Sequence, residues 1–400
     1  MTIKDQTTPA RPAARGGGTG RWPATAVFFL NGLALSTYIV RLPSLKGEHH
    51  LADGQLGVVG VLFALAALAS MQFVGPLVAR IGSRPVLRAS LVIMPLLLAF
   101  VGLAGGPVQF ALVATALGAV HGITDAAMNA HAVTVERLNR RPILNGCHAA
   151  WSVSAVVASL AMAALAHAGV SSTTHLVGAA TVLLAGGLVL GPLLLPATTD
   201  LRNAKAPARR HLGWRGGWTR PVVALGLTGM TLMVCEGAAL SWSAIFLHDS
   251  RGASLGLAVT AVTAYTAGQT GGRLVGDRLT MRYGAPPVFR TGGLVAACGL
   301  AMAVLAPQPA AAIAGFAVMG LGASVLLPLT FSAVGQADAT GPAAAAIVSR
   351  FTTFTYAGIL LGPAAIGWAA ELVGLAWALF ALIPVLFAVA LLTRLPRLRP

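Results

Sequence analysis

The stretch His121-Gly-Ile-Thr-Asp125-Ala-Ala-Met-Asn129 decides the fold class, because it sets polar side chains inside an apolar segment of residues 108–135. A carboxylate within a membrane-length apolar segment is costly, and it persists mainly where it lines a wet cavity or has a function. At about 100° per residue, His121, Asp125 and Asn129 share one helix face, and Glu136 ends the same stripe. The pattern predicts a membrane-spanning helix that is apolar all round except for one polar seam, as in helices that line a transport route.

The composition extends this prediction to the whole chain. The 400 residues are 56% hydrophobic and 10% charged, with a mean hydropathy of +0.79, whereas soluble domains contain about 25% charged residues. The net charge of +16 does not indicate nucleic-acid binding, because the basic residues lie in short gaps between apolar runs and not in a patch interleaved with aromatics. The composition excludes an ordinary soluble protein and favours a multi-pass membrane protein.

Apolar blocks of about 20 residues, the length that crosses a bilayer, recur along the chain. The first block is too long for a signal-peptide core and lacks a small-residue cleavage site, so we expect an uncleaved span. The 12 predicted helices lie near residues 22–45, 56–79, 85–104, 108–135, 145–168, 173–195, 221–247, 254–275, 285–306, 309–334, 344–368 and 371–393.

The basic residues predict the orientation. With a cytoplasmic N-terminus, all but three of the 27 basic residues fall on the inner side, and the outer three are Arg41, Lys46 and Arg251. This bias supports an even number of spans and two cytoplasmic termini. The expected parts are a disordered cytoplasmic tail (1–21), an N-terminal six-helix bundle (22–195), a basic cytoplasmic linker (196–220) and a C-terminal six-helix bundle (221–400).

The two halves carry related segments at the same place. The second span ends Gly75-Pro-Leu-Val-Ala-Arg80-Ile-Gly82-Ser-Arg84, and the eighth ends Gly272-Arg-Leu-Val-Gly-Asp277-Arg278-Leu-Thr-Met-Arg282-Tyr-Gly284. A repeat at half the chain length is typical of two-bundle transporters. The predicted fold class is therefore all-α integral membrane, with 12 transmembrane helices in two pseudo-symmetric six-helix bundles.

These two segments resemble the G-x-L-x-D-R-x-G-R-R loop between helices two and three of the major facilitator superfamily (MFS), and the topology matches over the whole chain. The resemblance implies a charged cytoplasmic gate that favours an outward-facing state. The first copy departs from the family pattern, because Ala79 stands where an aspartate is expected. We therefore expect Asp277 to make the main contribution to this cytoplasmic gate. The predicted gate residues are Arg80, Arg84, Asp277, Arg278 and Arg282.

A finer resemblance is to a poorly characterised bacterial inner-membrane branch near the fucose permeases. It rests on residues 125–131, 146–152 and 236–243. The resemblance implies a sugar or related polar solute and a location in the bacterial plasma membrane, although a fold does not fix a substrate.

Three residues are candidates for proton coupling. In the superfamily, helices one, four, seven and ten line the central cavity, which places Asp125 and Glu236 there. A carboxylate in a low-dielectric cavity can exchange a proton, and Glu236 could also contact a cationic or hydroxylated solute. His121 lies one turn from Asp125, where an imidazole could relay protons. For all three, a structural role in helix packing is the alternative.

Polar and aromatic side chains on other spans are candidates for substrate binding. Asn31 shares a helix face with Tyr38, Tyr265 shares one with Gln269, and His148 shares one with Trp151, although such a face also suits helix packing. The predicted substrate-binding residues are Asn31, Tyr38, Asn129, His148, Trp151, Tyr265 and Gln269. Arg350, near the cytoplasmic side, is interpreted as a snorkelling side chain and not an anion site.

The predicted function is secondary active transport of a small molecule by alternating access, coupled to protons. The alternative is efflux of amphipathic or cationic compounds by drug:proton antiport. The sequence contains no G-x-x-x-x-G-K-[ST] or H-E-x-x-H motif, so ATP-driven transport and an intramembrane enzyme are disfavoured, and a receptor without flux is a further alternative.

Few other partners are expected. Cys147, Cys235 and Cys298 lack metal-ligand spacing, so we expect no metal and no cofactor. We expect a monomer that binds a small-molecule solute and protons, lies in the lipid bilayer and binds no nucleic acid.

Overall fold

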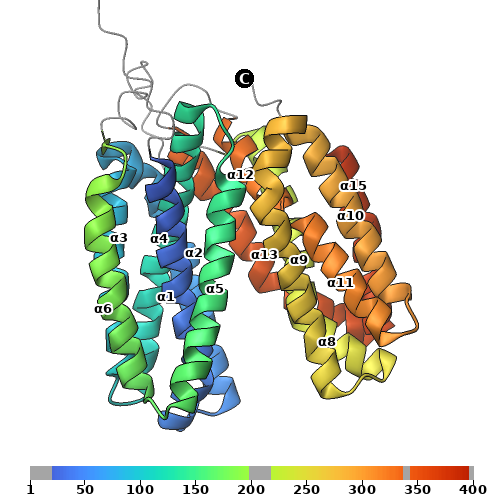
Figure 1. Cartoon of the computed structure of the whole chain (residues 1–400), viewed down its shortest axis with the longest axis horizontal. Coiled ribbons are helices and arrows are strands. Elements are labelled where there is room, and N and C mark those ends of the chain that lie inside the picture. Colours follow the sequence, from blue (N-terminus) through green and yellow to red (C-terminus); the bar gives the residue numbers. More distant parts are fainter. Residues whose placement is uncertain (1–19, 198–217, 337–342, 396–400) are drawn as a thin grey trace, which may run out of the picture.

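The computed structural model describes residues 20–197, 218–336 and 343–395, which form two bundles of helices joined by short turns (Figure 1). The expected tail lies outside the described residues up to residue 19, and the expected linker lies outside them over 198–217. The N-terminal bundle contains α1 (Arg21–Glu48), α2 (Asp53–Ile81), α3 (Ser83–Gly102), α4 (Pro107–Asn139), α5 (Leu144–His167), α6 (Ser172–Leu190) and the short η1 (Gly191–Leu193). The C-terminal bundle contains α8 (Arg220–Ile245), η2 (Phe246–Ser250), α9 (Leu255–Tyr283), α10 (Ala285–Leu305), α11 (Pro309–Ala323), α12 (Leu326–Gln336), α13 (Ala343–Val373), α14 (Leu375–Phe380) and α15 (Leu382–Leu392).

The predicted all-α fold with twelve spans is confirmed. Within the described ranges, 11 helical segments are long and apolar enough to cross a membrane. The remaining span is α9, a 29-residue helix between α8 and α10. Its polar residues Gln269, Arg273 and Asp277 recur every four positions, so they share one face, and all three are buried. Since α9 packs against α5, this polar face meets protein and not lipid.

Prolines divide two of the spans. Pro328 has no backbone N–H, and its ring clashes with the carbonyl group four residues earlier, at Ser324, where α11 and α12 separate. Pro384 stands in the same relation to Phe380, where α14 ends. The last span was predicted to begin near residue 371, and it begins a few residues later, at Leu375. The helix before it continues to Val373, and the turn falls at Gly374, whose φ of 85° suits glycine.

The internal repeat is visible in the backbone. Gly82, between α2 and α3, has φ 83° and ψ 165°, and Gly284, between α9 and α10, has φ 83° and ψ 161°. This left-handed region costs a residue with a Cβ atom energy, so glycine is expected in both copies. The two halves therefore make the same turn at corresponding positions.

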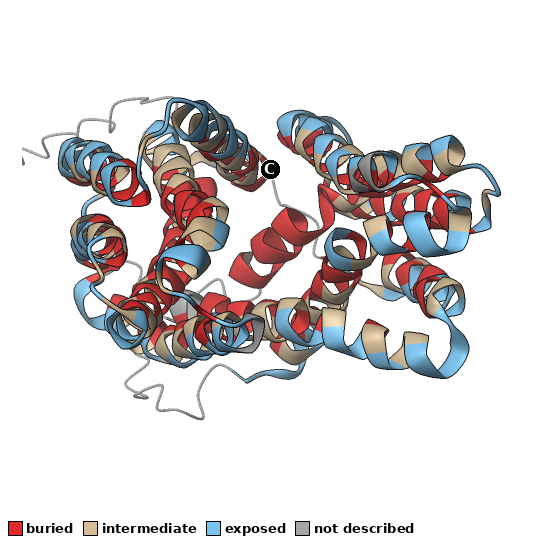
Figure 2. Ribbon diagram, turned by 90° about the horizontal axis from the view of Figure 1, so that it is seen from below, coloured by how far each residue is buried: buried red, intermediate tan, exposed pale blue. Residues whose placement is uncertain are grey.

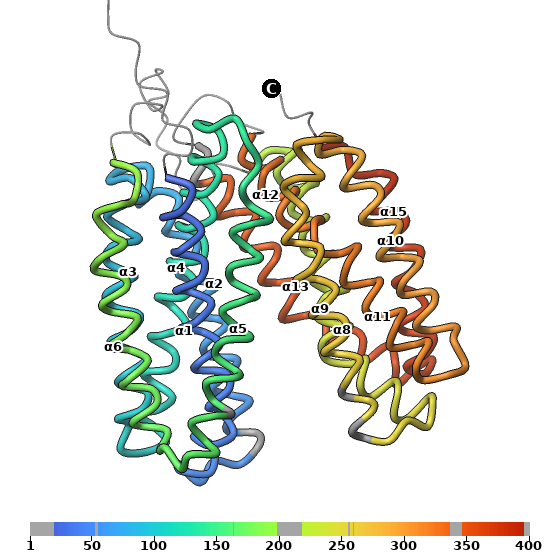
Figure 3. The backbone as a smooth tube through the Cα atoms, viewed as in Figure 1, coloured from blue at the N-terminus to red at the C-terminus, as the bar shows by residue number. Residues whose placement is uncertain are grey.

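The two bundles meet mainly toward one end. We call this the basic end, because it carries the α2–α3, α4–α5 and α9–α10 turns with their arginines. The bundles converge there and diverge toward the opposite end (Figures 1 and 3). Between the bundles, α2 packs against α13 and α5 against α9, while α12 contacts α4 and α5. Residues Leu326–Gly335 of α12 are all buried, and a buried helix lies between the bundles in Figure 2.

Candidate functional site

A hydrogen-bonded cluster joins the bundles near the middle of the spans. His121 of α4 has its Nδ1 atom 3.2 Å from Asn31 Oδ1 on α1 and its Nε2 atom 2.9 Å from the Tyr356 hydroxyl on α13. Because the Asn31 amide oxygen can only accept, the neutral imidazole donates from Nδ1, and its Nε2 accepts from the Tyr356 O–H. We call these three hydrogen-bonded residues, Asn31, His121 and Tyr356, together with Asp125 one turn along α4, the central cluster.

Asp125 lies one helical turn from His121, as predicted, and is half-buried. Its carboxylate is close enough to Tyr356 to interact with it electrostatically, and no side chain among the described residues donates a hydrogen bond to it. Asn129 donates instead to the Asp125 backbone carbonyl at 2.9 Å, and its own Oδ1 is buried without a partner. The seam therefore presents a carboxylate that remains available to a proton or a solute.

A second polar cluster lies where α5 meets α9. Arg273 Nη1 donates to Ser152 Oγ at 2.7 Å, and His148 lies close enough to Arg273 to interact electrostatically. The His148 ring is 5.2 Å from that of Phe28 on α1 and 5.9 Å from that of Phe331 on α12. We call His148, Ser152 and Arg273 the α5–α9 cluster. In the sequence, Arg273 is one of the basic residues expected on the inner side and is not a candidate site residue. Gln269 and Arg273 are four residues apart, and this spacing could have indicated that both lie on one polar, buried face of the helix.

A third group lies within the C-terminal bundle. Gln269 Nε2 donates to the Tyr265 hydroxyl at 3.4 Å, and Tyr265 is fully buried. Glu236 of α8 is half-buried and interacts electrostatically with Tyr265. Among the described residues no hydrogen bond reaches the Glu236 carboxylate. Three of the predicted residues thus come together on α8 and α9.

Two predicted substrate residues pack inside the N-terminal bundle. Tyr38 is buried and stacks on Phe63, with ring centroids 5.6 Å apart and planes 10° apart. Trp151 lies against Gly32 of α1, where an added Cβ atom would clash with the indole. Helix packing, the alternative named for such faces, describes both side chains in this conformation.

At the basic end, two carboxylates cap the N-terminus of α5. Asp277 of α9 accepts hydrogen bonds from the backbone N–H groups of Asn145 at 3.1 Å and Gly146 at 2.9 Å, and from the Asn145 side chain at 3.1 Å. Glu136 of α4 accepts from the Ile143 N–H at 2.9 Å. The first N–H groups of a helix lack intrahelical partners and carry partial positive charge, so carboxylates stabilise them. Asp277 therefore ties the two bundles together.

Among the described residues, no inter-bundle hydrogen bond involves the other four predicted gate residues. Arg80, Arg278 and Arg282 are exposed, and Arg282 lies over the Tyr283 ring at 5.3 Å. Arg84 Nη2 donates to the Pro192 carbonyl of its own bundle at 2.8 Å. With Ala79 on α2, Asp277 has no carboxylate counterpart in the first copy of the motif.

The α2–α13 contact uses uncharged groups and Arg350. The Gln72 amide donates to Thr353 Oγ1 at 2.5 Å, and its oxygen accepts from Arg350. Gly75 allows the α13 backbone to approach at Ala346. The interpretation of Arg350 as a snorkelling side chain is wrong, because Arg350 is 2% exposed and is held inward by Gln72. Arg350 also lies over the Trp218 ring, 5.2 Å from its centroid.

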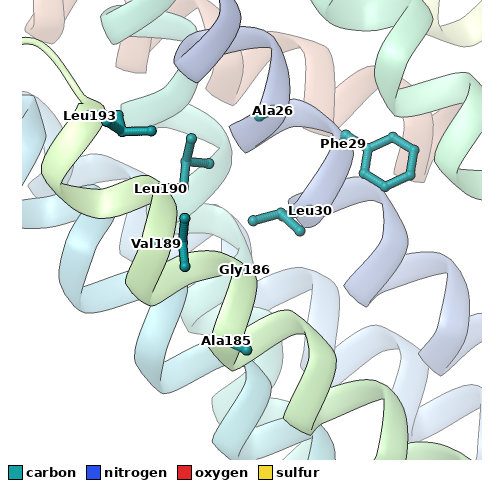
Figure 4. A pocket seen from close by; sticks show the side chains of 8 residues that line it. All are labelled: Ala26, Phe29, Leu30, Ala185, Gly186, Val189, Leu190 and Leu193. Atoms are coloured by element: carbon teal, nitrogen blue, oxygen red, sulfur yellow. The ribbon is translucent and has the colours of Figure 1, made fainter.

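Two surface cavities are lined by other residues. A cavity of about 480 Å³ between α1 and α6 is lined by apolar side chains and a glycine, among them Leu30, Gly186 and Val189 (Figure 4). A cavity of about 940 Å³ lies between α8 and α15. None of the predicted transport residues lines either cavity. Over the described segments, no group of three or more His, Cys, Asp or Glu residues could hold a metal ion.

The comparisons with known proteins agree with this architecture. The family model described as Major Facilitator Superfamily matches residues 24–262. An uncharacterised MFS-type transporter from Yersinia pestis is 32% identical over 347 residues, which cover 86% of this chain and 87% of that protein. An uncharacterised transporter from Sinorhizobium fredii is 34% identical over 355 residues, which cover 88% and 91%.

Among solved structures, a variant of the E. coli fucose:proton symporter FucP superposes with a TM-score of 0.75 at 17% identity, covering 92% of this chain and 96% of that chain. FucP in its outward conformation gives a TM-score of 0.78 at 16% identity with the same coverage. From its sequence relatives and its two-bundle fold, this chain belongs to the major facilitator superfamily.

Proposed function

We propose that this transporter moves a small polar solute by alternating access and couples the movement to protons. The observation that carries the proposal is the central cluster, in which the His121–Tyr356 hydrogen bond and Asp125 lie where the two bundles meet. When the bundles rock, the surroundings of a carboxylate at this contact change. Its affinity for a proton then differs between the two states, which is the requirement for coupling.

Protonation of Asp125 supplies the link between charge and movement. A charged carboxylate is costly to enclose in the membrane, whereas its protonated form is much less so. We infer that the protonated form permits the bundles to close around the centre, while the charged form holds the site open to water. Tyr356 supports this step because its hydroxyl interacts with both His121 and Asp125.

The contacts at the basic end supply the gate. Opening that end would break the bonds from Asn145 and Gly146 to Asp277 and the α2–α13 contact at Gln72. Because basic loops remain in the cytoplasm, we place this end there, together with both termini, in a bacterial plasma membrane. The conformation described is then closed to the cytoplasm and faces outward.

A polar solute such as a sugar fits the groups between the bundles. His148 and Ser152 supply hydrogen-bonding groups on α5, and Gln269 and Glu236 supply them in the C-terminal bundle. Phe28 and Phe331 are buried beside His148 and supply an apolar wall to this part of the contact between the bundles. The printed name of FucP, a fucose:proton symporter with the same fold, also supports this substrate class.

Proton flux in proteoliposomes tests the proposal. The full chain is reconstituted with a pH-sensitive dye inside, and hexoses, pentoses, sugar acids and cationic amphiphiles are added in turn. We expect one solute class to evoke acidification in the wild type and not in Asp125→Asn, while solute exchange without a gradient persists in that variant. Asp249→Asn, an exposed carboxylate in η2, is the matched control. Wild-type proton flux in Asp125→Asn would contradict the proton role.

A further inference from the structure

We propose that the transported solute carries a carboxylate group, and that Arg273 binds it together with His148. The inference rests on the proposed transport function and names the substrate class of the same site. It starts from the α5–α9 cluster, where three polar side chains from the two bundles converge.

Arg273 is a cation buried where α5 meets α9. It is 5% exposed, and its one hydrogen bond runs from Nη1 to the Ser152 hydroxyl at 2.7 Å. Its Nε atom is buried and has no partner. Among the described residues no carboxylate forms an ion pair with it. A buried guanidinium is costly unless an anion compensates it, so the cluster is incomplete as it stands.

The nearest acidic residue along α9 is already engaged. Asp277 lies one turn from Arg273, but Asn145 bonds to its Oδ1 atom and Gly146 to its Oδ2 atom. The Asp277 carboxylate therefore compensates the α5 N-terminus and not the guanidinium. The positive charge of Arg273 can therefore be compensated by an anionic ligand that enters between the bundles.

Like Arg273, His148 has a buried nitrogen atom without a hydrogen-bond partner. Its Nε2 atom is buried without a hydrogen-bond partner, while the residue as a whole is only half-buried. Phe28 and Phe331 lie against its ring, so part of its surroundings is apolar. Hydrogen bonds to ionised groups are stronger than neutral ones, and more so where water is excluded.

These groups fit a carboxylate better than a neutral or doubly charged group. The planar guanidinium fork matches the two oxygens of a carboxylate, and a neutral hydroxyl would leave the charge uncompensated. A single arginine in the cluster balances a single negative charge. A phosphate ester carries up to two negative charges and would find one cation there, so a carboxylate is the better match.

Matched pairs of solutes provide the test. The full-length protein is purified in detergent, and binding is measured for glucose with glucuronate, galactose with galacturonate, and glucose 6-phosphate. The variants are Arg273→Gln, Arg273→Lys and His148→Gln. The control is Arg290→Gln, which removes an exposed arginine of α10 at the same end.

We expect the wild type to bind a sugar acid more tightly than its neutral parent. Arg273→Gln should weaken binding of the acid by about 10-fold or more, the size expected for a charged hydrogen bond, and that of the neutral parent by less than about 2-fold. Arg273→Lys should retain part of the preference, because lysine keeps the charge without the fork. His148→Gln should also reduce it, and Arg290→Gln should not.

Other outcomes overturn the inference in different ways. An equal loss for acid and parent in Arg273→Gln would mean that Arg273 only holds α5 against α9. Wild-type binding of neutral sugars alone would remove the anionic class and leave the transport proposal standing. A preference for glucose 6-phosphate would replace the carboxylate by a phosphate. Absence of binding and of flux with every solute would instead contradict the proposed function, and this inference with it.

Discussion

The Nε2 atom of His121 lies 2.9 Å from the Tyr356 hydroxyl, and this hydrogen bond crosses from one six-helix bundle to the other. The two residues are 235 positions apart in the chain. Because Asp125 lies one turn away on α4 and also interacts with Tyr356, a change in its charge acts directly on an inter-bundle contact. In the proposed mechanism, proton binding and bundle movement therefore involve the same few side chains.

Removing the Tyr356 hydroxyl should weaken coupling more than stability. Tyr356→Phe keeps the ring and deletes the bond to His121, and a typical hydrogen bond contributes about 0.5–1.5 kcal/mol. We expect the unfolding free energy to fall by about 1 kcal/mol, and solute-evoked proton flux to fall several-fold. Dye-loaded proteoliposomes and thermal unfolding measure the two effects. The control is Tyr283→Phe, at the exposed end of α9. A wild-type proton flux in Tyr356→Phe would show that the Tyr356 hydroxyl is not needed for coupling.

Glu236 should contribute to solute binding. Its carboxylate has no hydrogen bond among the described residues, so a solute hydroxyl or cation can reach it without displacing a protein partner. Replacement by glutamine removes the charge and keeps the shape, and we expect Glu236→Gln to raise the solute dissociation constant by about 10-fold. Equilibrium binding measures this, and Glu371→Gln at the end of α13 is the control. Unchanged affinity together with unchanged coupling would exclude a role for Glu236.

Loss of the Asp277 cap should open the basic end. Asp277→Ala removes three hydrogen bonds to α5, and losing a helix cap costs about 1–2 kcal/mol, which shifts a two-state equilibrium roughly 5- to 30-fold. The native Cys147, buried beside this cap, reports the change through its rate of maleimide labelling. Cys235 and Cys298 are first replaced by serine.

We expect faster labelling of Cys147 in Asp277→Ala and an unchanged rate in Asp249→Asn. Equal labelling rates in the wild type and in Asp277→Ala would show that Asp277 does not hold the gate.

The close approach of α2 and α13 should tolerate no side chain at residue 75. An added Cβ atom at Gly75 would run into the backbone of Ala346, so Gly75→Val should prevent closure at the basic end and abolish solute transport. Gly60 of the same helix has nothing within 4 Å of an added Cβ atom, so Gly60→Val should transport normally. Counterflow of labelled solute compares the two. Normal transport by Gly75→Val would mean that this contact can separate without loss of function.

Several features of the fold and site followed from local sequence patterns. Hydropathy runs located the twelve spans, with an error of a few residues at Gly374, because apolar length is a property of each segment alone. The repeated motif predicted two related halves, and the structure adds that Gly82 and Gly284 form matching turns with positive φ, which favours glycine in both copies. Helical periodicity placed His121 and Asp125 on one face of α4.

The partners of these residues were decided by the tertiary structure. Arg350 and Gln72 are 278 residues apart, and no local sequence pattern relates them. The snorkelling interpretation of Arg350 was therefore wrong, because the distant Gln72 amide holds the guanidinium inside the protein. Tyr38 and Trp151 share helix faces with polar residues, yet they pack within their own bundle because neighbouring helices cover them. Periodicity determines which face a residue occupies, and only the packing of helices from both bundles determines what that face meets. For this reason the sequence alone determined the helices and their polar seams, and the tertiary structure decided that Tyr356 joins His121 and that Arg273 is buried with no carboxylate partner among the described residues.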